Sequence, residues 1–153
     1  TLEAKGYSVQ SKSMYIDMVV PPLNILEELL LPPETEVVRI QRIQLANAKP
    51  IAIITNYIIA ELVPGIISDS GTFVSLYHHL EAKYGIKITS ARDDIKAKVS
   101  DFLESELLQI PVGSPLIVDR RVTYSMSKPI EVVIMIVDGS KYEFSVTLSG
   151  RPS

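Results

Sequence analysis

The chain has 153 residues, of which 46% are apolar, enough for one compact domain that buries roughly 70% of its unfolded surface. It contains no cysteine, which excludes disulfide frameworks, thiolate metal sites and thiol nucleophiles and favours a reducing, cytoplasmic location. Its formal charge of −3 argues against a DNA-binding surface of its own, since gripping a phosphate backbone needs clustered Lys and Arg.

Seven stretches are rich in β-branched residues or alternate between apolar and polar residues, and we predict that they form strands. In chain order they are 7–19, 36–45, 51–59, 87–99, 116–124, 130–137 and 142–148. Helical spacing and terminators indicate helices at 23–30, at 73–84 and at 100–108. Because successive strands are joined by short turns, we expect a mainly antiparallel sheet with the helices covering one face, an α+β fold.

The sequence repeats itself at an offset of 79 residues. Seven residues of the first half meet an identical residue in the second half without a gap: Glu27, Leu29, Pro32, Arg42, Lys49, Pro50 and Ile51. The repeated unit reads helix, Pro-containing turn, strand, hairpin turn, strand. We expect two such units to form pseudo-symmetric halves of one sheet, with a cleft at their junction.

Metal and membrane binding are not indicated. The only histidines, His78 and His79, are adjacent and point about 100° apart on a helix, so they suit a solvated edge better than a chelate. The longest apolar runs, such as 132–137, are far shorter than the ~20 residues that span a bilayer. We therefore assign no metal, no cofactor and no membrane partner.

Three segments, in this order along the chain, resemble one domain family: VVRIQRIQLANAKPIAIITNYI, GTFVSLYHHLEAKYGIKI and LLQIPVGSPLIVDRRVTYSMSKPIEVVIMIVDGSKYEF. Together they resemble the UTRA domain, the effector-binding part of HutC-like regulators in the GntR family. The resemblance covers nearly the whole of 1–153 and implies a chorismate-lyase-like fold and a homodimer. It also implies a winged-helix DNA-binding domain before Thr1, with 1–20 following the linker.

The resemblance further implies a small-metabolite effector in a cleft between the sheet and its helices. The family's Arg-x-Arg on the second strand, whose guanidinium groups suit oxyanions, is here Arg42 followed two residues later by Gln44. Strand alternation places both on one face, so both are expected to line the cleft. The family's Ser-x-Tyr is retained as Ser75 and Tyr77, and the Glu of its Pro-x-Glu as Glu131.

Other positions depart from the family pattern and reduce the polarity of the expected cleft. Ile54 stands where the family often has an acidic residue, and Asn56, which we add to the expected effector-binding residues, where it has a small polar one. Val137 replaces an aromatic residue. The resemblance thus implies a less anionic, more apolar ligand than a sugar phosphate, or a pocket that has lost its ligand.

Each candidate residue also has a structural interpretation. Arg42 also suits an ion pair with a carboxylate along the sheet, and Ser75 suits a cap at a helix terminus. The Tyr77 ring is expected to pack in the core in either case. Glu131, in an apolar strand, needs a partner if it is buried.

Two further groups are interpreted as structural. We expect Arg121 to pair with Asp119, two residues away on the same face. We expect residues 92–94 to form a solvated loop or edge rather than a catalytic group.

Three functions remain open. The first is an effector-binding, dimerising module that modulates operator binding by the absent domain, as a repressor relieved by its effector. The second is a dimerisation module with a degenerate pocket, favoured by Ile54 and Val137. The third, a chorismate-lyase-type enzyme, is disfavoured because a dianionic substrate needs several cations and the relevant strands offer Arg42 and at most Arg121. We assign no catalytic residue.

Overall fold

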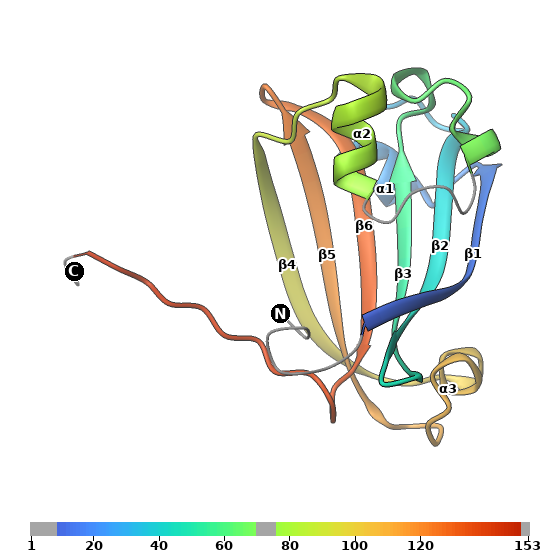
Figure 1. The fold of residues 1–153 in the computed structure, drawn as a ribbon, viewed down its shortest axis with the longest axis vertical. Coiled ribbons are helices and arrows are strands. Elements are labelled where there is room, and N and C mark those ends of the chain that lie inside the picture. Colours follow the sequence, from blue (N-terminus) through green and yellow to red (C-terminus); the bar gives the residue numbers. More distant parts are fainter. Residues whose placement is uncertain (1–8, 70–75, 151–153) are drawn as a thin grey trace.

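The computed structural model describes residues 9–69 and 76–150 of the chain. In this part, six strands form one open antiparallel sheet in the order β1-β2-β3-β6-β5-β4 (Figure 1). The strands are β1 (Val9–Val19), β2 (Val37–Ala46), β3 (Lys49–Ile58), β4 (Ser90–Val99), β5 (Pro115–Ser125) and β6 (Lys128–Asp138). The predicted α+β fold with an antiparallel sheet is confirmed.

The helices of the described residues connect these strands. Helix α1 (Leu23–Glu28) joins β1 to β2, and α3 (Phe102–Leu108) joins β4 to β5. Between β3 and β4 lie two short 3₁₀ helices, η2 (Ala60–Leu62) and η3 (Ile66–Asp69), and then α2 (Leu76–Tyr84). None of the helices in 9–69 and 76–150 is long and apolar enough to cross a bilayer.

The duplication predicted from the sequence is confirmed at the level of the backbone. The hairpin turns Asn47-Ala48 and Met126-Ser127 are 79 residues apart, and all four residues have positive φ, from 50° to 71°, as type I′ turns require. Leu30 and Gln109, which follow α1 and α3, share a φ near 58°. Each hairpin also has one register shift, and the two shifts lie at equivalent positions, after Gln44 in β2 and after Thr123 in β5.

The two halves meet where β3 pairs with β6. Thr55 lies directly opposite Ile134, and these two residues are themselves equivalent in the repeat. The flanking pairs, Ile54 with Met135 and Asn56 with Val133, exchange with each other under the same offset. An approximate two-fold axis therefore passes through the centre of the sheet, perpendicular to it. Rotation about this axis does not exchange the two faces of the sheet.

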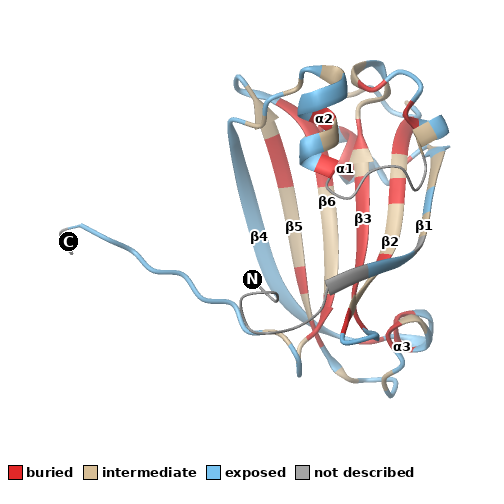
Figure 2. Cartoon of the chain, in the orientation of Figure 1, coloured by how far each residue is buried: buried red, intermediate tan, exposed pale blue. Residues whose placement is uncertain are grey.

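The helices lie on both faces of the sheet, which corrects the prediction that they cover one face. Helix α1 packs through Leu26 against Val122 and Val132, and α3 packs through Leu108 against Ile53 on the same face. Helix α2 lies on the opposite face, where Leu80 joins a cluster with Ile40 and others (Figures 1 and 2). The reason is topological: β3 is central and β4 is an edge strand, so the connection between them crosses the sheet.

The predicted strand at 142–148 is wrong. The structure gives this segment no strand partner; Tyr142 packs against the sheet, and the chain then runs away from it (Figure 1). Phe144, Val146 and Leu148 are 56%, 67% and 89% exposed. The alternation of apolar and polar residues is typical of a strand, but alternation alone supplies no neighbouring edge to pair with.

Candidate functional site

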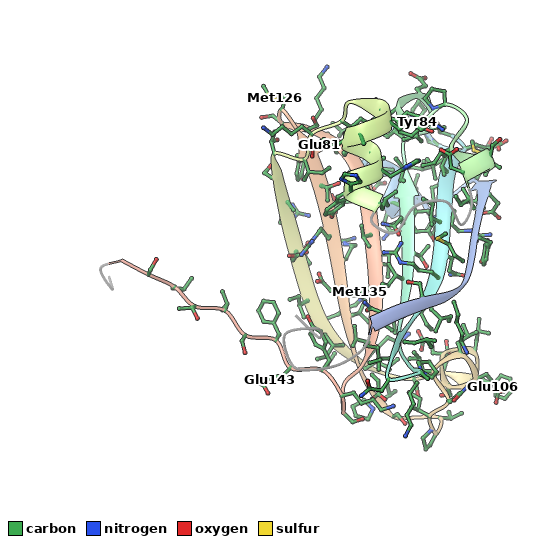
Figure 3. All side chains as sticks on the ribbon, viewed as in Figure 1. Glu81, Tyr84, Glu106, Met126, Met135 and Glu143 are labelled. Atoms are coloured by element: carbon green, nitrogen blue, oxygen red, sulfur yellow. The ribbon has the colours of Figure 1, made fainter. Side chains whose placement is uncertain are left out.

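A cavity of about 310 Å³ lies on the face of the sheet that α2 covers. Strands β2, β3, β6 and β5 form its floor and the start of α2 forms one wall; Met135 marks its position on β6 (Figure 3). The lining residues are Arg42, Ile54, Asn56, Leu76, Tyr77, Asp119, Arg121, Val133 and Met135.

The sheet residues of the cavity come from two adjacent rows that cross four strands in register. One row is Arg42, Ile54, Met135 and Asp119, and the next is Ile40, Asn56, Val133 and Arg121. Six of the lining residues are repeat equivalents: Arg42 with Arg121, Ile54 with Val133, and Asn56 with Met135. The cavity therefore lies on the pseudo-two-fold axis, at the junction where the repeat predicts a cleft.

Arg42 is a half-buried cation without a close carboxylate partner among the described residues. Its Nη1 is 3.5 Å from Asn56 Oδ1, the outer limit of a hydrogen bond. Burial lowers the pKa of Arg42, and the negative charge of Glu131 offsets part of this effect. The guanidinium keeps its charge at neutral pH, because arginine is effectively always protonated in proteins. It can therefore donate to an acceptor in the cavity.

Glu131 lies on the same face of the sheet as the cavity, one row beyond Asn56 and Arg121, and is fully buried. Asn56 Nδ2 donates to its Oε2 at 2.8 Å, and Thr123 Oγ1 donates to its Oε1 at 3.2 Å. Burial raises the pKa of this carboxyl, while the Asn56 and Thr123 hydrogen bonds act in the opposite direction. Glu131 does not line the cavity; it fixes Asn56, whose side chain stands between Glu131 and Arg42.

Arg121 has a carboxylate partner, but not the predicted one. Its Nε and Nη2 donate to the two oxygens of Asp93 at 2.7 and 3.1 Å. This hydrogen bonding raises the pKa of Arg121 and lowers that of Asp93. The expected pairing with Asp119 is wrong because Asp93 on β4 lies directly opposite Arg121, whereas Asp119 is two residues away along β5.

Asp119 is left with an unsatisfied oxygen. Its Oδ1 is buried and has no hydrogen-bond partner among the residues that the structure describes. Burial and the nearby charge of Asp93 raise the pKa of Asp119 to about 6. Buried acceptors without a donor are rare in folded proteins. Asp119 as a residue also lines the cavity, so its carboxyl is within reach of a ligand that donates hydrogen bonds.

The other expected site residues lie in different places. Tyr77 lines the cavity and is 36% exposed; burial raises the pKa of its hydroxyl, and the charge of Glu131 adds to this. Gln44 is half-buried on the same strand face as Arg42 but is not among the lining residues. Ser75 lies outside the described residues. The structure thus brings Arg42, Asn56 and Tyr77 together at the cavity.

Five lining residues were not expected as site residues: Leu76, Asp119, Arg121, Val133 and Met135. The repeat itself carries the signal that would have found two of them. Arg121 is the equivalent of Arg42, and Asp119 shares its strand face by alternation. No group of three or more potential ligands for a metal ion occurs in 9–69 and 76–150.

Comparison with known proteins agrees with this architecture. The sequence model of the UTRA domain matches residues 4–143. The chain belongs to the UTRA domain family. It is 32% identical over 131 residues to the HTH-type transcriptional regulator Rv0792c of Mycobacterium tuberculosis, covering 83% of this chain and 48% of that protein. It is 30% identical over 107 residues to the HTH-type transcriptional repressor NagR of Bacillus subtilis, covering 69% of this chain and 44% of that protein. This UTRA chain thus spans slightly less than half of each relative.

Solved structures share the fold. The effector domain of PhnF from Mycobacterium smegmatis superposes with a TM-score of 0.87 at 20% identity, covering 97% of this chain and 92% of that one. A GntR-family transcriptional regulator from Enterococcus faecalis V583 superposes with a TM-score of 0.76 at 29% identity, covering 92% of this chain and 100% of that one. The relatives are transcription regulators, and their relationship to this UTRA chain supports a regulatory role rather than an enzymatic one.

Proposed function

We propose that this domain is the effector-sensing and dimerising part of a GntR/HutC-type transcription regulator in the cytoplasm. A winged-helix domain, placed before Thr1 in the full-length protein, makes the contact with operator DNA. The effector is a small metabolite that binds in the cavity at the junction of the two halves and relieves repression. The observation that carries this proposal is that cavity, with Arg42 unpaired at its edge in the described part of the chain.

The position of the cavity suits a sensor. Its floor combines equivalent residues of both halves, and its wall is the start of α2, the helix on this face of the sheet. A ligand there contacts three separate parts of the fold at once. Allosteric control requires that the ligand binds two conformations with different affinity, and a site built from several elements provides that difference when those elements shift.

The alternatives are less well supported. A degenerate pocket is disfavoured because the cavity is open and retains a charged lining, although Ile54 does make its floor apolar. Val137, the other apolar departure, lies in the same buried cluster as Ile54 but does not itself line the cavity. A lyase acting on a dianion is disfavoured because the second cation of the cavity, Arg121, is already neutralised by Asp93.

The homodimer is supported by two exposed features. Within 9–69 and 76–150, strand β4 pairs with β5 on one side only, and all ten of its residues are exposed. The extended segment 142–148 alternates polar residues with the exposed Phe144, Val146 and Leu148. A bare edge strand and an unpaired alternating segment are complementary, so each copy of the chain can add its segment to the β4 edge of the other. Such a reciprocal exchange gives a closed two-fold dimer.

The proposed function is tested with the full-length regulator. A metabolite panel is screened for thermal stabilisation, and each hit is then added to a complex of the regulator with the DNA upstream of its own gene. A metabolite that stabilises the protein and releases the DNA supports the proposal. Stabilisation without any change in DNA affinity contradicts a sensor, because linkage requires the two binding events to affect each other.

A further inference from the structure

We propose that the effector is a small zwitterion: an oxyanion at one end binds Arg42, and an ammonium group at the other end binds Asp119. This inference rests on the proposed function, since it takes the cavity to be the effector site. It goes further by specifying the chemistry of the ligand and its orientation.

The two charged side chains lie at opposite ends of one row of residues. Arg42 is opposite Ile54, which is opposite Met135, which is opposite Asp119. Neighbouring strands are ~4.8 Å apart, so three spacings separate the two ends of the row by about 14 Å at the backbone. The middle of the row is apolar. A ligand along the row therefore meets a cation, a hydrophobic floor and a carboxylate, in that order.

Neither end of the row has its charge matched by a close partner in the described residues. Arg42 has only the long contact to Asn56, and Asp119 Oδ1 has no hydrogen-bond donor. The positive charge of Arg121 acts on Asp119, but Arg121 already donates two hydrogen bonds to Asp93. An ammonium group in the cavity can donate to the Asp119 carboxyl, and an oxyanion supplies a strong acceptor for Arg42.

The charge balance of the site disfavours a dianion. Among the lining residues and their ion-pair partners, Arg42 and Arg121 are matched in number by the carboxylates of Asp93 and Asp119 when these are ionised. A ligand without net charge keeps that balance, whereas a phosphorylated ligand adds negative charge to a half-buried site that already contains Asp119. Removing uncompensated charge from water is costly, so the balanced ligand is favoured. The volume of about 310 Å³ is at the lower end for ligand pockets, which suits a small molecule.

The repeat explains why the site has one orientation. The equivalent of Asp119 in the first half is Ile40, and the equivalent of Met135 is Asn56. The arginines are therefore duplicated while the carboxylate is not. Within the cavity lining, only the end of the row on β5 presents an acidic side chain, so the ammonium end of the ligand is directed there.

The test uses the full-length regulator and probes in matched sets. The proteinogenic amino acids and straight-chain ω-amino acids are each compared with the acid that lacks the amine, and dicarboxylates and sugar phosphates are added. Affinities are measured by calorimetry for the wild type, Asp119→Asn and the control Asp94→Asn, whose side chain pairs with Arg92 on an exposed edge. The melting temperature of each variant verifies that it is folded.

We expect at least one zwitterion to bind at least tenfold more tightly than its deaminated partner. Asp119→Asn should abolish this preference, and Asp94→Asn should keep it. The inference is overturned if a dicarboxylate or sugar phosphate binds most tightly, or if Asp119→Asn leaves the preference intact; either result leaves the proposed function standing. If no probe of any class stabilises the protein or changes its affinity for DNA, the proposed function fails, and this inference fails with it.

Discussion

Arg42 and Arg121 line one cavity from equivalent positions of the two halves, yet in the described structure only Arg121 is held by a carboxylate. The difference comes from the edge strands. Asp93 on β4 faces Arg121, whereas the register of β1 gives Arg42 no opposite residue, because a shift lies between Lys12 and Tyr15. The two arginines occupy equivalent positions, and they differ because the edge strands β1 and β4 differ in what they place opposite them. Arg121 stabilises the sheet, and Arg42 is available to a ligand.

Asp119 should make the stability of the domain depend on pH. Its pKa in the fold is about 6, above its value in an unfolded chain, so the folded state binds the proton more tightly. Its contribution to stability is therefore complete below pH 4 and is lost as the pH rises towards 6 and above. Asp119→Asn removes this dependence. Relative to the wild type, the variant should gain stability between pH 4.5 and 7.5, by at most about 3 kcal/mol and less with solvent screening.

Urea unfolding of both proteins at the two pH values measures this difference. If the free energies of unfolding of wild type and Asp119→Asn differ by the same amount at both pH values, the environment of Asp119 does not disfavour its charge.

Glu131 should matter for stability through its two hydrogen bonds. Glu131→Leu leaves the buried Asn56 amide and Thr123 hydroxyl without an acceptor, so we expect a loss of about 1–3 kcal/mol for each unsatisfied group. Glu131→Gln keeps a carbonyl for Asn56 and should cost much less. Chemical denaturation of the two variants provides the comparison; equal losses would mean that packing, and not hydrogen bonding, is the role of this side chain.

The hairpin turns offer a test of the duplicated backbone. Ala48 and Ser127 have φ of 65° and 71°, a region that costs non-glycine residues about 1 kcal/mol. Ala48→Gly and Ser127→Gly should each raise the free energy of unfolding by about 0.5–1 kcal/mol. Ala97→Gly, in the exposed strand β4, is the control and should lower it. If thermal melting shows that both turn variants lose stability, the type I′ assignment is wrong.

The segment 142–148 should hold the dimer together. Changing Phe144, Val146 and Leu148 to serine removes its apolar side chains, which are all exposed in the single chain, so the monomer fold should remain intact. We expect the variant to shift towards the monomer in sedimentation at micromolar concentration. The control changes the polar residues Ser145 and Thr147 to alanine and should leave the dimer unaffected. A triple variant that sediments as the wild type does would place the interface elsewhere.

Much of the fold follows from the sequence because its signals are local or repeated. Alternation in β2, β3, β5 and β6 and the Gly or Pro residues near the helix ends predict the elements, and the offset of 79 residues predicts how they are duplicated. The position of the cavity follows as well, since the repeat places Arg42 and Arg121 around one axis.

The remaining features depend on non-local pairing. The partner of Arg121 is set by the register between β4 and β5, which fixes Asp93 opposite it and leaves Asp119 unpaired. The face occupied by α2 is set by the order of the strands in the sheet. The residue pattern within each strand does not reveal that order. Gln44 shows a further limit: it shares a strand face with Arg42, but the cavity extends from Arg42 towards Asp119 and not along β2.

Calorimetric titration of Arg42→Ala with the effector that emerges from the panel tests the central claim most directly. Arg39→Ala is the matched control, because Arg39 lies on the other face of β2 and pairs with Asp17. Loss of a charge-assisted hydrogen bond should cost Arg42→Ala about 1.5–3 kcal/mol, a weakening of roughly ten- to a hundredfold or more, while Arg39→Ala binds as the wild type does. Wild-type affinity in Arg42→Ala would mean that the effector binds outside this cavity.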